Sequence, residues 1–216
     1  MIISHYGRGM VKVQQGEAVV IFNPIGEIKG GPGGVKPVKM GADIALVSLR
    51  DEAYNGVANA ARGERTPFVV DGPGEYEVND IFIKGFATAG PGDRTNTAYL
   101  VTLEQTRLLH LGALTSEKLP DALAEGAGVV DILFVPVGSP RLHGEGNGTL
   151  LTPKQAAQVI SDLEPGLVVP VDYDDKTLSI FLKELGAEKE SLAESLTIKK
   201  KDLVAGQTRV AIVKSY

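Results

Sequence analysis

The side chains that could carry chemistry in this sequence are three histidines and many carboxylates. The histidines are His5, His110 and His143, and the chain has no cysteine. A serine nucleophile in a Gly-x-Ser-x-Gly turn would indicate acyl transfer, but that motif does not occur. The lack of cysteine excludes a thiolate nucleophile, a disulfide framework and a zinc ribbon. What remains is acid–base or metal chemistry built on imidazole and carboxylate groups.

Paired carboxylates of the glycosidase type are one alternative, because two acidic groups can act as acid and base on a sugar. The acidic candidates are Glu75, Glu77, Asp172, Asp174 and Asp175. Almost any acidic protein offers such a set. We therefore do not interpret these carboxylates as a glycosidase site.

The composition limits the partners of the chain. Its 216 residues are 43% hydrophobic, with a formal net charge of -5, which is consistent with one soluble globular domain over residues 1–216. An acidic protein gives no electrostatic reason to bind nucleic acid, and we interpret the basic run at 199–201 as a solvated strand edge. No apolar stretch is long enough to span a membrane, and residues 1–5 lack the charged and apolar regions of a signal peptide, so we expect a cytoplasmic protein.

The first half of the sequence has the pattern of short strands separated by turns. Strands are expected in an N-terminal region containing His5 and at residues 11–13, 18–22, 44–47, 67–70, 76–78, 81–85, 98–102 and 107–111. Residues 51–61, directly after a buried apolar run, are predicted to form a short helix.

The second half alternates strands and helices. Buried strands are expected at residues 131–137 and 167–171, and a closing strand at 208–213. Thr152, Pro153 and Gln155 form a capping box with proline in the first turn, which predicts a helix start, and Asp174 or Asp175 can cap a second helix that ends before Gly186. Strands followed by mixed elements predict an α+β protein with two sheets packed face to face and helices outside.

A series of short segments, in this order, resembles a known family. They are ADIALVSLRDEAYN at residues 42–55, GPGEYEV at 72–78, NTAY at 96–99, LHLG at 109–112, PVG at 136–138 and LTPKQAA at 151–157. The chain resembles the metallo-β-lactamase-fold superfamily, and within it the Zn-dependent hydrolases similar to ascorbate-6-phosphate lactonase. The resemblance implies a four-layer αβ/βα sandwich with two mostly antiparallel or mixed sheets.

The resemblance also shows where the metal ligands of the family would lie. Those enzymes hold zinc with a His-x-His-x-Asp-His segment after a buried strand, a later histidine, a bridging aspartate and a final histidine, and the bound water becomes the nucleophile. The later histidine is expected in the turn directly after Gly85, but residues 86–91 contain no histidine. At the other ligand positions this chain has Leu49, Asp51, Ala53, Tyr54, Ala113 and Asp172. Aliphatic side chains cannot coordinate a metal, so this resemblance implies a degenerate metal site and no cofactor.

We therefore expect a non-catalytic binding or structural protein, with a small molecule or a protein as its partner. The resemblance places a candidate ligand pocket at Asp51, Tyr54, Asn96, His110, Asp172 and Tyr173. His110 precedes the bridging position and is interpreted as a hydrogen-bonded structural residue. Neither His5 nor His143 has a partner visible in the sequence.

Three alternatives stay open. The chain could be a metal-dependent hydrolase of a small phosphorylated or lactone substrate with an altered site. Asp51 and Asp172 could together accept Mg²⁺ or Ca²⁺, which prefer oxygen ligands. The chain could also be a scaffold subunit beside an active relative, since the resemblance implies proteins that often assemble into oligomers, homo-oligomers included.

Overall fold

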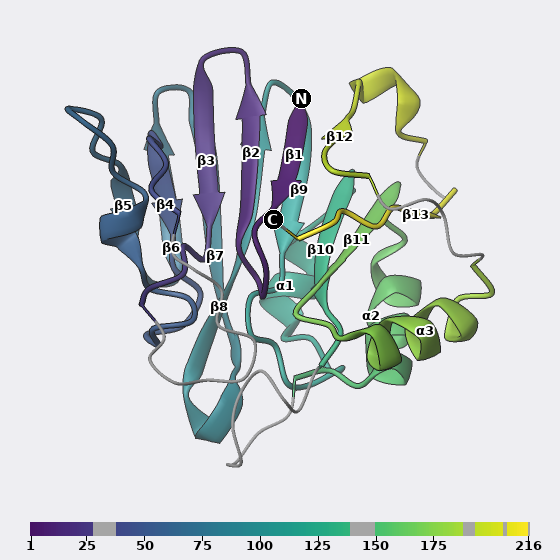
Figure 1. Cartoon of the computed structure of the whole chain (residues 1–216). Helices are drawn as coiled ribbons and strands as arrows, with labels where there is room; N and C mark the ends of the chain where they lie inside the picture. The colour runs from purple at the N-terminus through teal and green to yellow at the C-terminus, as the bar shows by residue number, and fades with distance from the viewer. Residues whose placement is uncertain (28–37, 139–149, 188–192, 205–206, 216) are drawn as a thin grey trace.

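Two β-sheets packed face to face form the body of the molecule (Figure 1). The computed structural model describes residues 1–27, 38–138, 150–187, 193–204 and 207–215. One sheet has six strands in the order β12-β1-β2-β3-β4-β5, and the other has seven in the order β13-β11-β10-β9-β8-β7-β6. The predicted α+β sandwich is therefore confirmed.

The strands of the six-stranded sheet come from the N-terminal part of the chain and from one late strand. They are β1 (Ile2–His5), β2 (Val11–Gln15), β3 (Ala18–Phe22), β4 (Ile44–Leu46), β5 (Phe68–Val70) and β12 (Leu196–Thr197). β1, β2 and β3 pair antiparallel, whereas β3, β4 and β5 pair parallel. The turn after β1 and the ends of β3 and β4 consequently meet at one edge of the sheet.

The seven-stranded sheet begins antiparallel and ends parallel. Its strands are β6 (Gly74–Val78), β7 (Ile81–Ala89), β8 (Thr95–Leu103), β9 (Thr106–His110), β10 (Ile132–Pro136), β11 (Leu167–Val171) and β13 (Arg209–Val210). β9, β10, β11 and β13 run parallel. Their carboxyl ends therefore lie at one edge of the sheet, and this is the edge where ligands usually bind in parallel sheets.

Three α-helices are present in the described residues, and they pack on the outer face of the seven-stranded sheet. They are α1 (Asp121–Gly126), α2 (Pro153–Leu163) and α3 (Asp175–Glu184). The predicted capping box of α2 is confirmed, and Asp174 caps α3 through the backbone N–H of Thr177. A core of side chains including Leu133, Val159 and Phe181 fills the space between helices and sheet, while Phe22 and Phe134 pack between the two sheets.

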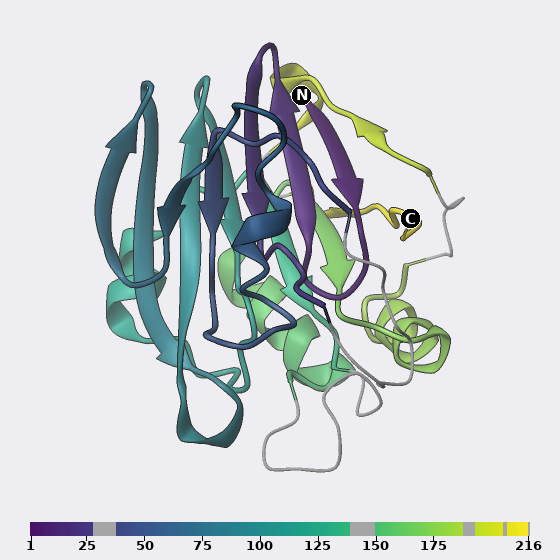
Figure 2. The ribbon, with the colours of Figure 1, turned by 60° about the vertical axis from the view of Figure 1, so that its left-hand side comes forward.

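The outer face of the six-stranded sheet is covered by irregular chain, which lies in front of these strands in Figure 2. The helix predicted over residues 51–61 is wrong: the structure has turns there and one 3₁₀ helix, η1 (Val57–Asn59). The reason is Gly56, whose N–H donates to the Pro24 carbonyl at 2.6 Å. A Cβ at Gly56 would lie 2.2 Å from the backbone of Ile25, so this segment is held against its neighbour in the fold.

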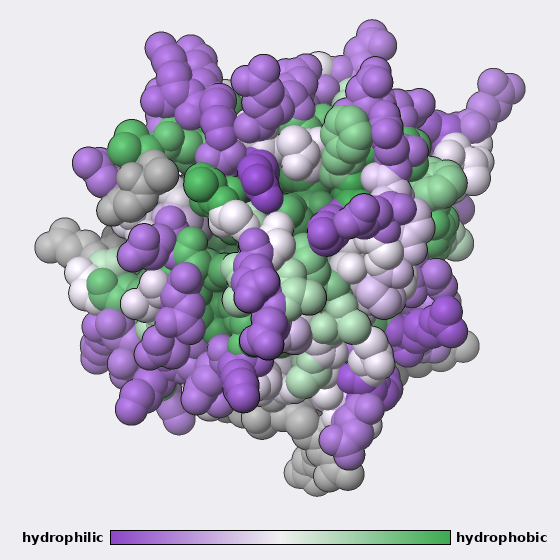
Figure 3. Space-filling model, turned by 180° about the vertical axis from the view of Figure 1, so that it is seen from behind, coloured by the Kyte–Doolittle hydropathy of each residue, from purple (hydrophilic) through white to green (hydrophobic). Residues whose placement is uncertain are grey.

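Two smaller predictions also need correction. Of the closing strand predicted at 208–213, Arg209–Val210 is regular strand and Val213 makes an isolated bridge to Ala193. The basic run at 199–201 is not a free strand edge, because the 3₁₀ helix η4 (Lys200–Asp202) begins there and Lys200 forms an ion pair with Asp131. A further short 3₁₀ turn, η2 (Pro91–Asp93), precedes β8. Seen from behind, the surface carries hydrophilic residues around and between hydrophobic ones (Figure 3).

Candidate functional site

The positions where the family resemblance places metal ligands are largely filled by an apolar cluster. It consists of Leu49, Ala53, Tyr54, Ala113 and Leu150, which are at most 3% exposed. Leu49, Ala53 and Tyr54 follow β4, and Ala113 follows β9, so the two sheets contribute facing sides of the cluster. Close packing in such a cluster leaves its members in contact with one another rather than with solvent.

A hydrogen bond borders this cluster. The Tyr54 hydroxyl donates to Oδ2 of Asp172 at 2.9 Å, and both residues are fully buried. Burial raises the pKa of the Tyr54 hydroxyl well above its ordinary value, and the neighbouring Asp172 carboxylate raises it further. The phenol therefore stays protonated and acts as a donor.

The turn between β1 and β2 closes the site from the side of the six-stranded sheet. A Cβ at Gly9 would lie 3.0 Å from Oδ2 of Asp172, 3.2 Å from the Tyr54 ring and 3.3 Å from Nδ2 of Asn23. Arg8, Asn23 and Asp172 all have positive φ angles, of 47°, 49° and 54°. Non-glycine residues adopt this region at a cost, and such residues often cluster at sites that the surrounding fold holds in place.

Several buried polar atoms at this edge have no hydrogen-bond partner in the part of the chain that the structure describes. Among them are Nε of Arg8, Nδ2 of Asn23 and Oγ of Ser48. The other amide atom of Asn23, Oδ1, accepts the backbone N–H of Ser48 at 2.9 Å. Guanidinium and amide nitrogens carry protons and have no lone pair for a metal, so the first two are donors.

His110 is a structural residue in its observed setting. Its Nδ1 accepts the backbone N–H of Gly112 at 2.9 Å, so the proton is on Nε2, which donates to the Gly9 carbonyl at 3.0 Å. The ring stacks against Phe22 and Phe134, with centroids 5.1 and 5.5 Å away. Burial lowers the pKa of His110 to about 4, so the ring is neutral at pH 7 and both nitrogens serve the backbone.

Asn96, at the start of β8, ties three segments together. Its Nδ2 donates to Oγ1 of Thr88 at 2.7 Å and to the Leu111 carbonyl at 2.9 Å, while Oδ1 accepts the backbone N–H of Ala113 at 2.7 Å. Asn96 is fully buried. The side chain thus fixes the turn after β9 on which the cluster depends, and its amide is fully used.

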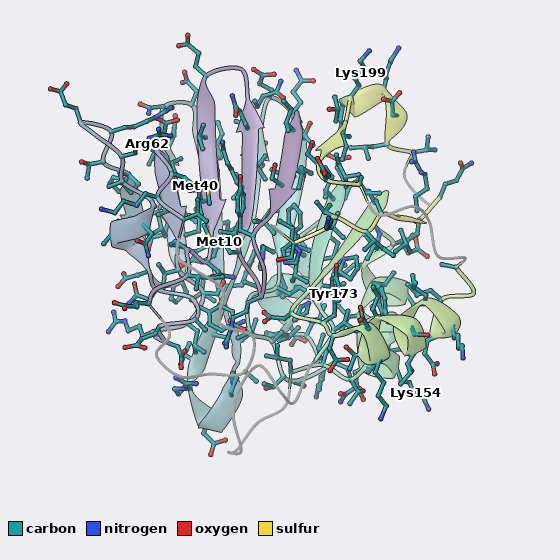
Figure 4. The ribbon with its side chains drawn as sticks, viewed as in Figure 1. Met10, Met40, Arg62, Lys154, Tyr173 and Lys199 are labelled. Atoms are coloured by element: carbon teal, nitrogen blue, oxygen red, sulfur yellow. The ribbon has the colours of Figure 1, made fainter. Side chains whose placement is uncertain are left out.

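The remaining candidate residues lie around this centre. Asp51 accepts the backbone N–H of Ala53 and pairs with Arg94 at 3.0 Å, on the solvent side of the cluster. Tyr173, labelled in Figure 4, lies on the segment between β11 and α3, and its hydroxyl donates to the Val213 carbonyl at 3.3 Å. Tyr54, Asp172, His110 and Asn96 therefore lie around the turns that follow β1, β4, β9 and β11. The hydroxyl of Tyr173 points away from them, toward Val213.

His5 does not complete a catalytic arrangement in the part of the chain that the structure describes. Nε2 of His5 lies 2.7 Å from the Arg8 carbonyl and therefore donates to it, and burial lowers the pKa of His5. His143 lies outside the described residues. In the described ranges no three histidine, cysteine or acidic side chains converge as a metal would require.

The described residues at this edge do not fit a zinc site. Zinc needs about four nitrogen, sulfur or oxygen donors around one point, whereas the candidate carboxylates of Asp51 and Asp172 have separate partners and His110 has no nitrogen to spare. Leu49, Ala53 and Ala113 fill the neighbouring space. No step of chemistry through a metal follows from this arrangement.

Four residues at the site were not expected from the sequence: Arg8, Gly9, Asn23 and Ser48. The available signals were the Gly7-Arg8-Gly9 run between two strands and the Asn23-Pro24 pair that ends β3. These patterns indicate turns, and turns alone do not indicate which other segments they meet.

Comparisons with known proteins agree with the fold. Residues 3–172 match the model of the beta-lactamase superfamily domain. A solved structure from Thermotoga maritima, assigned to the Zn-dependent hydrolases of the metallo-beta-lactamase superfamily, has a TM-score of 0.76 and 24% sequence identity, over 100% of this chain and 99% of that chain.

More distant structures share the same fold. Igni18, a metallo hydrolase from the archaeon Ignicoccus hospitalis, has a TM-score of 0.63 and 11% identity over 92% of this chain and 99% of its own. An isothiocyanate hydrolase from Delia radicum gut bacteria has a TM-score of 0.64 and 9% identity over 98% of this chain and 96% of its own. A search of curated proteins found no match.

The described helices are all too short or too polar to cross a membrane. The family match runs from β1 to the residue after β11, and so includes every strand of the two sheets except β12 and β13, together with the turns that carry Gly9, Tyr54 and Asp172. Because this match covers most of the chain and the solved structures share its two-sheet sandwich, the chain belongs to the beta-lactamase superfamily and has the metallo-beta-lactamase fold.

Proposed function

We propose that this protein is a non-catalytic binding or structural member of the superfamily, whose metal ligands have been lost. The observation that carries the proposal is the packed cluster of Leu49, Ala53, Tyr54 and Ala113 at ligand positions. A hydrolase of this fold needs a metal to lower the pKa of a bound water. Side chains that pack against one another supply neither the metal nor the open position for that water.

The hydrogen bond between Tyr54 and Asp172 supports the same proposal. In the family resemblance these two positions would each give an imidazole to the metals. Here they bind each other across the two sheets at 2.9 Å. In this proposal the hydrogen bond links the two sheets directly, as bridging metal ions would in a metal-binding relative.

We further propose that the chain is one domain and derives from the branch similar to ascorbate-6-phosphate lactonase. The ordered segments quoted for that resemblance support the branch. Pairing of β12 with β1 and of β13 with β11 supports the single domain, because the end of the chain completes both sheets. A cytoplasmic location remains an expectation from the sequence.

The second candidate function is a metal-dependent hydrolase with an altered site. It is favoured by the hydrolases among the similar solved structures and by the carboxylates of Asp51 and Asp172. It is opposed by His110, whose ring nitrogens are both engaged by backbone groups. We therefore place it second.

Metal analysis separates the two proposals. The chain is produced in medium supplemented with zinc and manganese, dialysed, and measured by elemental analysis, together with the double variant Asp51→Ala/Asp172→Ala. We expect substoichiometric metal in both proteins. Stoichiometric metal in the natural chain that is lost in the double variant would overturn the non-catalytic proposal.

The partner is a small molecule or a protein, and the chain could act as a scaffold for an active relative or for further copies of itself. Co-purification from the native host, with and without cross-linking, tests this part. We expect the chain to retain a specific partner. Recovery of the chain alone as a monomer under both conditions would contradict a scaffold role.

A further inference from the structure

A separate cavity lies between the last turns of α2 and α3 and the edge strand β13. Its volume is about 620 Å³, within the range of roughly 300–1,000 Å³ that is common for small-molecule sites. Gly166, which precedes β11, and Arg209, which begins β13, are joined backbone to backbone beside it. The cavity is therefore at the amino ends of the parallel strands, opposite the edge that carries Tyr54 and Asp172.

The cavity has an apolar floor. Ile160 of α2 is 4% exposed, and Leu185 and Val210 are half-buried, so their side chains offer aliphatic surface to a ligand. Covering such surface stabilises a complex in proportion to the apolar area removed from water. The floor thus favours a ligand with a branched aliphatic group.

Two opposite charges line the same cavity. Glu164 and Arg209 are both exposed, and neither side chain forms an ion pair or a hydrogen bond within the part of the chain that the structure describes. Among the described residues, therefore, no partner competes with a ligand for either group. The Glu164 carboxylate suits an ammonium group, and the Arg209 guanidinium suits a carboxylate.

The helix ends add to this polarity. Glu164 caps α2 and its N–H donates to the Ile160 carbonyl at 2.9 Å, while α3 ends in a turn in which the Ala187 N–H donates to the Leu182 carbonyl at 2.9 Å. Both helices therefore direct their carboxyl ends, the negative ends of their dipoles, toward the cavity. This arrangement favours a positive group beside Glu164.

We propose that this cavity binds a small zwitterion with an aliphatic side chain, namely an apolar amino acid or a short apolar peptide. The ammonium group faces Glu164 and the helix ends, the carboxylate faces Arg209, and the aliphatic group rests on Ile160, Leu185 and Val210. This inference is independent of the metal question, because it uses no residue of the site at the other edge.

Isothermal titration of the full chain tests the ligand class. Leucine and leucyl-leucine are compared with isoamylamine, which lacks the carboxylate, and with isocaproate, which lacks the ammonium group. We expect saturable binding of at least one zwitterion, and binding of the two single-charge analogues weaker by about tenfold or more. No saturable binding of either zwitterion, or equal binding of an analogue, would overturn the proposal.

Charge-neutral variants test the residues. Glu164→Gln and Arg209→Gln are each expected to weaken binding of the zwitterion by about tenfold. The matched controls are Glu125→Gln on α1 and Lys154→Gln at the opposite end of α2 (Figure 4), both exposed and away from the cavity. Circular dichroism confirms that all four variants fold. If the Glu164 and Arg209 variants bind as the controls do, the assignment of this cavity is wrong.

Discussion

The Tyr54 hydroxyl donates to Oδ2 of Asp172 across the two sheets, at 2.9 Å and with both side chains fully buried. Tyr54 follows β4 of the six-stranded sheet, and Asp172 follows β11 of the seven-stranded sheet. A hydrogen bond to a buried carboxylate is stronger than a neutral one because the acceptor is charged. This contact therefore joins the two sheets at the edge where the family resemblance places the metal ligands.

Removing the phenol tests the strength of that contact. Tyr54→Phe keeps the ring but leaves a buried carboxylate with one donor fewer, and we expect the free energy of unfolding to fall by about 1.5–3 kcal/mol. The control is Tyr173→Phe, whose hydroxyl makes a longer bond of 3.3 Å to a backbone carbonyl and is partly exposed. Its loss should be about 1 kcal/mol or less. Urea unfolding of both variants measures the difference, and equal losses would contradict the role given to Tyr54.

Restoring one carboxylate of the family should damage the protein rather than bind metal. Ala113 is fully buried beside Leu49 and Leu150. Ala113→Asp would place a charged carboxylate inside this apolar cluster, so we expect the free energy of unfolding to fall by about 3 kcal/mol or more. Added zinc should not reverse that loss. Ala124→Asp, on the exposed face of α1, is the control and should change stability by about 0.5 kcal/mol or less. Thermal unfolding with and without zinc measures the stability of both variants. A zinc-dependent rise in the stability of Ala113→Asp would show that a metal site persists.

The strands were the part of the fold that local sequence pattern could predict. The buried run at residues 132–136 and the alternation in β7 each depend on neighbouring residues in the chain, and so does the capping box that begins α2 at Thr152. The helix predicted at 51–61 failed because the position of Gly56 is decided by contact with Ile25, which is distant in sequence. α1 is six residues long, which is too short for a helical period to stand out.

The site was less accessible to sequence reasoning, for a physical reason. Tyr54 and Asp172 were candidates because a family resemblance aligned them with metal ligands, and no spacing connects residues 118 positions apart. Gly9 and Asn23 reach the same point because β1 and β3 run parallel and end at the same edge. Sheet order is set by long-range pairing, so turn residues of this kind become visible as neighbours only in the folded chain.

The buried histidine should make stability depend on pH. Burial lowers the pKa of His110 in the folded protein to about 4, below its ordinary value of 6.5. Between these two values the unfolded chain binds the proton more readily, so stability rises with pH in this window. Neutral His110 therefore contributes fully to the free energy of unfolding above pH 6.5, and this contribution is lost as the pH falls toward 4. The total loss is about 3 kcal/mol at most.

Unfolding in urea at pH 7 and pH 5 measures this dependence, and NMR titration of the ring protons gives the pKa directly. His110→Gln is expected to be less stable at pH 7 but to lose less stability between the two values. His5→Gln serves as the comparison, because burial also lowers the pKa of His5. A ring that titrates near 6.5 in the folded chain would contradict the burial of His110.

A glycine after β9 holds the most crowded point of the site. Gly112 has a φ of +62°, and a Cβ there would lie 2.5 Å from Oδ1 of Asn96 and from Oγ of Ser48. Gly16 has a similar φ of +57° in the turn between β2 and β3, with nothing within 4 Å of its Cβ position. The two substitutions to alanine therefore share the backbone strain and differ in the collision. Gly16→Ala should cost about 1–2 kcal/mol, and Gly112→Ala about 2 kcal/mol more, because Asn96 must also give up hydrogen bonds to Thr88, Leu111 and Ala113. Urea unfolding of the pair checks the difference, and equal losses would mean that the turn after β9 can move away from Asn96 and that the packing at this edge is looser than the structure indicates.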